Sequence, residues 1–341
     1  MSDLLKCYLV SKDAESRVSA EVTERSRDDL PEGEVLVRVA YSSLNYKDAL
    51  AATGQPGVNR IFPHVPGVDA AGTVAESGVY EFVEGDPVIV TGFDMGSNRW
   101  GGWAEYVSVP QDWIVPLPER LTLRQSMILG TAGLTAGFSI DAIQRHGVTP
   151  DSGPVVVTGA SGGVGSMAVA ILSKLGYRVS AVSGKPSAHE FLTKLGAAEI
   201  LPRERVDDRT DKPLLPRRWA GAVDTVGGNT LGTIIRSTQL GGCVAACGLV
   251  GGGDLPVTVY PFILRGVTLA GIDAAWATPL PLRHETWFRL STTWKPDLLE
   301  EMAQFVELDQ LPEKIDDILA GRMVGRTVVT IGGEEPLRED D

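Results

Sequence analysis

The amino-acid sequence predicts an α/β protein of two domains, one rich in β-strands and one built on a doubly wound parallel sheet. At 341 residues, the chain is long enough for two hydrophobic cores. Short strands separated by Gly and Pro turns occupy the first part of the chain, and strands then alternate with helices. We therefore expect a β-rich domain over residues 1–121 and 272–341 and a doubly wound domain over residues 122–271.

The β-rich domain is predicted from alternating apolar residues. Val35, Val37 and Val39 fall on one face of an extended segment, as they would in a half-buried strand. The expected strands lie at residues 34–40, 72–76, 86–90, 106–109 and 326–331. We expect the last of these strands to return to the first domain.

The doubly wound domain is predicted from short, continuously apolar runs. The expected strands lie at residues 155–157, 178–182, 222–226, 243–247 and 267–271. Val155–Val157 is a β-branched run, which is typical of a strand buried on both faces. Repeated strand–helix units of this kind predict parallel strands joined by crossover helices.

The turn after the first of these strands is the most informative segment. Gly159, Gly162 and Gly165 mark a tight turn into a helix expected over residues 166–175. Backbone amides at a helix start favour an anion, and glycine lets the chain approach a pyrophosphate closely. A Gly-rich turn alone is a weak signal, but a strand before it and a helix and strand after it indicate a dinucleotide site.

The end of the second parallel strand indicates which dinucleotide is bound. An NAD site usually places Asp or Glu there, whereas this chain has Ser183, Gly184 and Lys185. A hydroxyl and an ammonium suit a 2′-phosphate, because charge-assisted hydrogen bonds to phosphate are strong. Arg203, after the next expected strand, is placed to close over the same phosphate. These residues favour NADPH, although Lys185 alone would be read as a solvated loop lysine.

Composition excludes several function classes. The chain is 43% hydrophobic and 22% charged, and its net charge of −13 argues against nucleic acid as a partner. No segment reaches the ~18 apolar residues that span a bilayer, and the N-terminal residues lack the apolar core of a signal peptide. Three cysteines do not form a disulfide framework, so we expect a cytoplasmic protein without membrane attachment.

The cysteines and histidines do not predict a metal site. Cys243 and Cys247 lie in a predicted strand, where buried thiols are the simpler interpretation. The four histidines are scattered, and neither a CxxC pair nor an HExxH motif is present. We therefore expect no metal.

Several segments carry a family resemblance. Residues 42–50, 66–73 and 130–136 resemble the quinone-oxidoreductase-like branch of the medium-chain dehydrogenase/reductase superfamily. Residues 100–105, 219–227, 245–249 and 261–267 resemble, more specifically, the NADPH-dependent acryloyl-CoA reductases. The resemblance covers residues 34–331 and weakens over residues 273–308. It implies a GroES-like catalytic domain with a Rossmann domain.

The resemblance also implies a reaction without zinc. Gly67, Val68 and Asp69 stand where zinc-dependent members have Gly-His-Glu, and the four-cysteine lobe is absent. The implied activity is reduction of acryloyl-CoA to propanoyl-CoA, in which hydrogen bonds alone stabilise the enolate. A quinone or small-enone reductase and a non-catalytic NADPH-binding protein are the alternatives. An acyl-CoA thioester and a second copy of the chain, in a homodimer, are the expected partners.

The resemblance carries over to individual residues. The expected cofactor-binding residues are Tyr46, Thr131, Gly162, Gly163, Val164, Gly165, Ser166, Ser183, Gly184, Lys185, Arg203, Leu249, Ile263 and Arg326. Arg283 and Arg326 are expected to bind substrate. Tyr46 is the candidate proton donor or oxyanion partner, and Asn45 is expected to position the ligand or cofactor. A structural turn with a half-buried ring is an equally good interpretation of this pair. Asp69 is more often a structural acceptor than a base, and Ala274 stands where the family has Ser.

Overall fold

The chain divides into two compact units, which are described separately. The computed structural model describes residues 4–59, 61–276 and 278–332. Unit 1 comprises Met1–Thr131, Thr278–Ser291 and Leu299–Asp341, and unit 2 comprises Ala132–Ala277 and Thr292–Leu298. The domain boundaries predicted from the sequence fall after residues 121 and 271.

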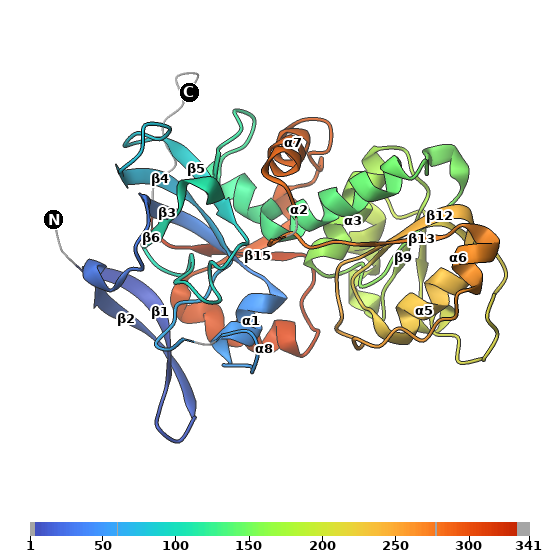
Figure 1. The fold of residues 1–341 in the computed structure, drawn as a ribbon, viewed down its shortest axis with the longest axis horizontal. Helices are drawn as coiled ribbons and strands as arrows, with labels where there is room; N and C mark the ends of the chain where they lie inside the picture. Colours follow the sequence, from blue (N-terminus) through green and yellow to red (C-terminus); the bar gives the residue numbers. More distant parts are fainter. Residues whose placement is uncertain (1–3, 60, 277, 333–341) are drawn as a thin grey trace. The chain divides into compact units, whose positions relative to one another are not determined.

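Unit 1 is built on a seven-stranded, mostly antiparallel sheet within the described residues (Figure 1). Its strands are β3 (Val35–Leu44), β4 (Asp69–Ser77), β5 (Pro87–Thr91), β6 (Tyr106–Val109), β7 (Ile114–Pro116), β14 (Ala303–Val306) and β15 (Arg326–Thr330). The strand order is β14-β15-β3-β4-β5-β7, and β6 also pairs with β3. β1 (Leu4–Lys12) and β2 (Val18–Ser26) form a separate antiparallel pair.

The C-terminal strand completes this sheet. β15 pairs antiparallel with β3, with Thr327 opposite Leu44, so the prediction that the tail returns to the first domain is confirmed. The helices of unit 1 are α1 (Tyr46–Ala52), α7 (Leu280–Ser291) and α8 (Leu311–Leu319). The inward-facing Val35, Val37 and Val39 are buried, as their alternation predicts.

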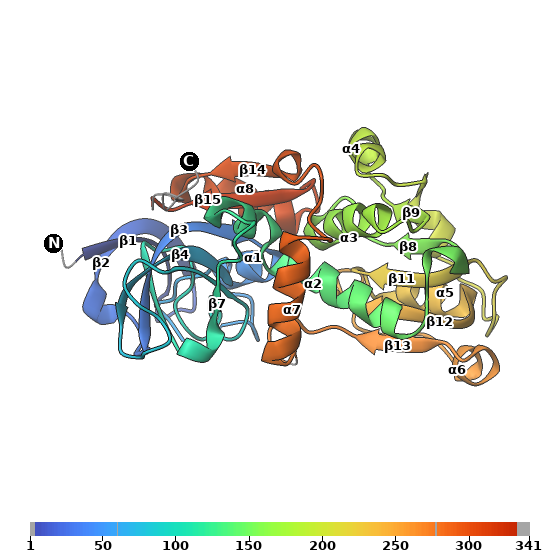
Figure 2. The same cartoon turned by 90° about the horizontal axis from the view of Figure 1, so that it is seen from above.

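Unit 2 is a six-stranded parallel sheet with flanking helices. Its strands are β8 (Val155–Val157), β9 (Val179–Val182), β10 (Glu199–Leu201), β11 (Trp219–Asp224), β12 (Thr238–Ala246) and β13 (Thr268–Gly271). The order β10-β9-β8-β11-β12-β13 is that of a Rossmann fold, and Figure 2 shows it from β9 at the top to β13 at the bottom. The helices are α3 (Gly163–Lys174), α4 (His189–Lys194), α5 (Gly228–Ser237) and α6 (Tyr260–Arg265). The predicted fold class is confirmed.

Helix α2 (Leu123–Arg145) is interrupted by one glycine. Gly130 has a φ of 49° and a ψ of −156°, which are not helical, so two helical segments meet there. By length and composition α2 could cross a membrane, but 89% of its apolar window is buried inside the protein. Burial of this kind is typical of the core helix of a soluble protein.

Candidate functional site

The glycine-rich turn of unit 2 has the geometry of a phosphate cradle. A Cβ on Gly165 would lie 2.3 Å from the carbonyl oxygen of Gly159, so only hydrogen fits there. Gly159 itself has a φ of 55°, a left-handed conformation that favours glycine. Helix α3 starts here, and the amides of its first turn have no partner within the helix. The predicted Gly162, Gly163, Val164 and Ser166 all lie in this cradle or the first turn, so the residues present fit a pyrophosphate.

A buried carboxylate supports this turn from the neighbouring strand. Asp224, at the end of β11, accepts hydrogen bonds from Thr158 Oγ1 at 2.7 Å and from the Gly227 amide at 2.7 Å. Burial raises the pKa of Asp224, and both hydrogen bonds oppose that rise. The sequence reasoning did not select Asp224. The sequence feature that could have identified Asp224 is an acidic residue at the carboxyl end of an otherwise apolar strand.

The predicted 2′-phosphate residues are brought together at the end of β9. A Cβ on Gly184 would lie 2.6 Å from Arg203 Nε, which shows that the Arg203 side chain lies against Gly184. Ser183 is buried and its hydroxyl accepts the Lys185 amide at 3.2 Å. Partial burial and then the positive charge of Arg203 lower the pKa of Lys185. Two cations held this close repel each other, and a phosphate would relieve that repulsion.

Leu249 and Ile263 lie at opposite edges of the unit 2 sheet. Leu249 is 71% exposed in the loop after β12, beside the carboxyl end of β11. Ile263 lies on α6, whose last residue, Arg265, donates to the carbonyl of Thr238 at the amino end of β12. The carboxyl edge binds the nucleotide in such sheets, and the prediction that Ile263 lines the nicotinamide end stays a prediction.

In unit 1, Asn45 and Tyr46 start helix α1. Asn45 caps the helix, and its backbone amide donates to Asp48 Oδ2 at 2.8 Å. The Asn45 side chain donates to Asp69 Oδ2 at 2.9 Å and accepts from Arg326 Nη1 at 3.1 Å. Tyr46 is 41% exposed. The amide of Asn45 is therefore held within its own unit, whereas the adjacent Tyr46 is exposed.

Two carboxylates lie beneath this turn. Asp69 is fully buried and accepts from Ser43 Oγ at 2.5 Å, from Thr131 Oγ1 at 2.6 Å and from the Thr131 amide at 3.0 Å. Asp48 is also fully buried and accepts the Val68 amide at 2.8 Å. Burial, followed by the charge of Asp69, raises the pKa of Asp48 to about 7. Thr131, a predicted cofactor residue, is therefore bound to Asp69 through both its hydroxyl and its amide.

Arg326 provides the positive charge in this cluster. Its side chain donates to the carbonyl of Ile128 at 3.0 Å and to Ser43 Oγ at 2.9 Å, and its Nη2 lies 3.8 Å from Asp69 Oδ2. Only 3% of Arg326 is exposed. We predicted from sequence that Arg326 binds cofactor and substrate. In the structure its guanidinium is buried among groups of unit 1, and a direct contact to cofactor or substrate stays a prediction.

Arg283 is also enclosed within unit 1. It lies on α7 with no exposed surface, donates to the carbonyl of Thr91 at 3.1 Å, and lies 4.7 Å from the centre of the Phe93 ring. Phe93 in turn stacks on Trp113. Substrate binding by Arg283 stays a prediction, and in this structure its buried guanidinium contacts the end of β5. It joins α7 to the end of β5.

The residues present do not fit a zinc ion. Among the residues that the structure describes, no three of His, Cys, Asp and Glu gather in a group that could hold a metal. Asp69 lies in the segment where zinc-dependent relatives have Gly-His-Glu. Its carboxylate oxygens already accept hydrogen bonds from Ser43, Asn45 and Thr131. Burial raises the pKa of Cys7 to about 12 and that of Cys243 to about 11, so both remain protonated thiols.

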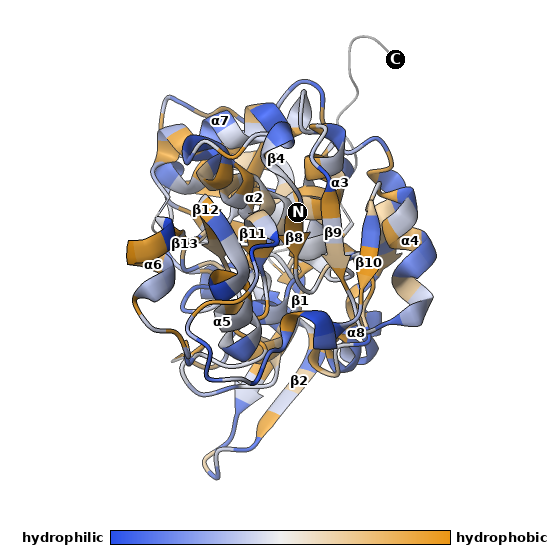
Figure 3. Cartoon of the chain, turned by 90° about the vertical axis from the view of Figure 1, so that its right-hand side faces the viewer, coloured by the Kyte–Doolittle hydropathy of each residue, from blue (hydrophilic) through white to orange (hydrophobic). Residues whose placement is uncertain are grey.

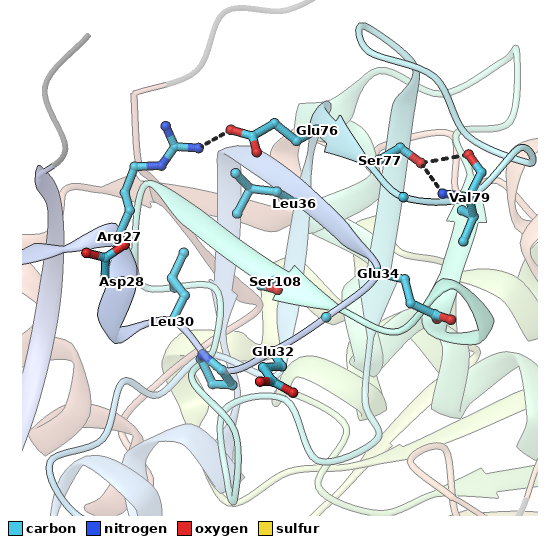
Figure 4. A pocket seen from close by; sticks show the side chains of 13 residues that line it. Arg27, Asp28, Leu30, Glu32, Glu34, Leu36, Glu76, Ser77, Val79 and Ser108 are labelled. Atoms are coloured by element: carbon cyan, nitrogen blue, oxygen red, sulfur yellow. Dashed lines mark hydrogen bonds and ion pairs between the residues drawn. The ribbon is translucent and has the colours of Figure 1, made fainter.

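A surface hollow on unit 1 is separate from these residues. It has a volume of about 860 Å³ and lies beside the Arg27–Glu76 ion pair, which is 2.7 Å long (Figure 4). Its lining contains Asp28, Glu32 and Glu34 but no member of the Asn45–Asp69 cluster. An acidic hollow repels an anionic cofactor, so this hollow is not a candidate site.

Comparisons with known proteins agree with this geometry. Residues 31–119 match the alcohol dehydrogenase GroES-like domain, and residues 163–278 match the zinc-binding dehydrogenase family. The acrylyl-CoA reductase AcuI of Ruegeria pomeroyi is 46% identical over 329 residues, covering 96% of this chain and 99% of that protein. The putative quinone oxidoreductase YhfP of Bacillus subtilis is 46% identical, covering 97% of this chain and 100% of YhfP.

Solved structures show the same fold. The YhdH oxidoreductase of Salmonella enterica in complex with NADP has a TM-score of 0.92 and 45% identity, over 96% of this chain and 100% of that one. The structure of Bacillus subtilis YhfP with NAD bound has a TM-score of 0.93 and 46% identity, also over 96% of this chain and 100% of that one. With identity of this level over nearly the whole length, the chain belongs to the quinone oxidoreductase-like group of medium-chain dehydrogenases and reductases that includes the acrylyl-CoA reductases.

Proposed function

We propose that this protein is an NADPH-dependent reductase that converts acryloyl-CoA to propanoyl-CoA. The observation that carries the proposal is the Ser183, Lys185 and Arg203 group at the end of β9, in a chain 46% identical to acrylyl-CoA reductase AcuI. NADPH, when bound, supplies the hydride that adds to the β-carbon of the thioester. The α-carbon takes a proton, so that the carbon–carbon double bond is reduced and NADP⁺ is formed.

The residues of unit 2 hold the cofactor. The cradle around Gly165 and the first turn of α3 bind the pyrophosphate through backbone amides. Ser183, Lys185 and Arg203 bind the 2′-phosphate. Leu249, exposed at the carboxyl edge of the sheet, meets the nicotinamide end.

The residues of unit 1 serve the acyl group. Negative charge develops on the thioester oxygen as the hydride arrives, and a preorganised donor there lowers the barrier by a few kcal/mol. Tyr46 is the proposed donor, either to this oxygen or, as a proton source, to the α-carbon. Asn45 and Thr131, both hydrogen-bonded to Asp69, fix the backbone and the side chains next to Tyr46. No step is assigned to a metal.

The alternative is a reductase of quinones or small enones, which the name of YhfP supports. A side-by-side assay of NADPH oxidation with acryloyl-CoA, crotonyl-CoA and a benzoquinone separates the two. We expect turnover with acryloyl-CoA at micromolar to millimolar concentration. Ready turnover of the quinone with none of acryloyl-CoA would establish the alternative, and no turnover of any acceptor would indicate a non-catalytic NADPH-binding protein.

The choice of NADPH over NADH depends on Lys185. Loss of a charge-assisted hydrogen bond removes about 1.5–3 kcal/mol, so Lys185→Ala should raise the KM for NADPH roughly 10- to 150-fold and leave that for NADH nearly unchanged. Lys194→Ala is the matched control, because Lys194 pairs on the surface with Glu190 in the same unit. Equal KM values for both cofactors in the unmodified enzyme would contradict this prediction.

Metal independence follows from the zinc-free interpretation of the sequence. We expect dialysis against a strong chelator to leave kcat and KM unchanged, because every proposed contact to the reacting groups is a hydrogen bond. Activity that disappears on dialysis and returns with zinc would show that the interpretation is wrong.

A homodimer and a cytoplasmic location complete the proposal. Val259, Ile263 and Leu264, on and beside α6, are all more than half exposed, and the neighbouring strand β13 pairs on one side only among the described strands. Figure 3 shows α6 as an apolar segment. Exposed apolar surface beside a free sheet edge favours association with a second copy. Sedimentation equilibrium measures the resulting mass.

A further inference from the structure

The Asp69 carboxylate stands at the centre of the unit 1 cluster. Its two oxygens accept hydrogen bonds from Ser43, Asn45 and Thr131, which come from strand β3, the start of α1 and the segment after Gly130. Asp69 itself is the first residue of β4. One fully buried carboxylate therefore joins segments that lie 24 to 62 residues away from it in sequence.

We propose that Asp69 is a positioning residue for the reduction, which it serves by fixing the orientation of Asn45 and Thr131. This inference rests on the proposed function only for the choice of assay substrate. Asp69 does not touch solvent, so it acts through the groups it holds. Tyr46 follows Asn45 directly and is the first residue of helix α1, so fixing Asn45 fixes the backbone from which the Tyr46 side chain projects.

Asp69 is well suited to this role because its partners are all donors. Asn45 Nδ2, Ser43 Oγ and the Thr131 amide and hydroxyl converge on its two oxygens. Asn45 Oδ1 faces Arg326 Nη1, so the side-chain amide of Asn45 has one orientation that satisfies both ends. An ionised carboxylate accepts on both oxygens, whereas an amide accepts on only one.

A glycine makes room for this arrangement. A Cβ on Gly130 would lie 2.5 Å from Asp69 Oδ2 and 2.9 Å from Arg326 Nη2. The helix break at Gly130 therefore brings the Thr131 amide against the carboxylate. This close approach defines the position of Thr131, which we expect to contact the cofactor.

The test is Asp69→Asn, which keeps the size of the side chain and turns one acceptor into a donor. We expect kcat with acryloyl-CoA to fall about 100-fold, as for a misplaced catalytic group, with the KM for NADPH changed less than about threefold. With NADPH deuterated at the transferred position, the kinetic isotope effect on kcat should rise, because hydride transfer becomes slower than product release. In the ligand-free protein, hydrogen exchange at the Thr131 amide should become faster.

A structural role would give a different result. Val88→Ala is the matched control, since Val88 is fully buried in the same sheet but lies outside the cluster. It should lower Tm while leaving the isotope effect and the Thr131 exchange rate unchanged. If Asp69→Asn behaves like Val88→Ala, with activity falling only in proportion to the folded fraction, the proposal is overturned.

A double-mutant cycle gives an independent check. Once Asn45→Ala has removed the group that Asp69 orients, Asp69→Asn should lower kcat by much less than it does in the unmodified enzyme. Fully additive losses would overturn the proposal. If the unmodified enzyme reduces a quinone and not acryloyl-CoA, the proposed function fails, and the same cycle with the quinone still tests Asp69.

Discussion

Gly165→Ala should weaken NADPH binding roughly 30- to 150-fold, as measured by quenching of protein fluorescence on titration. A methyl group at this position would lie 2.3 Å from the Gly159 carbonyl oxygen and 2.7 Å from Ala160 Cα, and both are backbone atoms that cannot rotate away. The turn must open to admit it, at about 2–3 kcal/mol of overpacking strain, which corresponds to the stated loss of affinity.

Gly78→Ala is the control for loss of a glycine. Its Cβ would meet only the Glu34 carbonyl oxygen, at an ordinary 3.5 Å, in unit 1. It should leave NADPH affinity unchanged. If Gly165→Ala also leaves the NADPH affinity unchanged, the turn around Gly165 does not bind the pyrophosphate and the prediction is wrong.

Arg326→Ala should destabilise the protein by about 3–5 kcal/mol, the usual result of removing one partner of a buried ion pair. The guanidinium makes hydrogen bonds to Ile128, Leu44, Asn45 and Ser43, and its removal leaves Asp69 buried without a nearby positive charge. Chemical denaturation measures the loss. Arg322→Ala, which removes an exposed arginine paired with Asp317, should change stability by less than about 0.5 kcal/mol.

The same variant separates two roles for Arg326. Because its side chain is enclosed within unit 1, the remaining activity should fall by a similar factor with acryloyl-CoA and with a CoA-free enone such as methyl vinyl ketone. A loss confined to the CoA ester would show that Arg326 binds the CoA part of the substrate, in line with the substrate-binding role that the family resemblance implies.

The parallel-sheet unit could be predicted from local sequence patterns, whereas the contacts within the unit 1 cluster could not. Gly162, Gly165 and Ser183 are close in the chain to the strands that position them, so a local pattern was sufficient. The role of Ile263 stays a prediction, because a motif match carries no information about which edge of the sheet its helix approaches.

The burial of Arg283 and Arg326 could not be predicted from the sequence, for a different reason. An arginine in an acidic chain is most simply expected to face solvent or an anionic ligand. Their partners, such as Thr91 for Arg283 and Asn45 for Arg326, lie 192 and 281 residues away in sequence, and only the folded sheet brings them together. The central position of Asp69 was hidden for the same reason, although its acceptor character was predicted.

The return of β15 to the sheet of unit 1 has a consequence for synthesis on the ribosome. Strands β3 and β4 emerge early, with the two buried carboxylates Asp48 and Asp69, but the cation that balances them is residue 326. All of residues 132–277 emerge in the meantime and can form the parallel sheet of unit 2. Until Arg326 is translated, unit 1 lacks both an internal strand and its charge partner, so the edge of β3 that β15 later covers stays open to pairing with another chain.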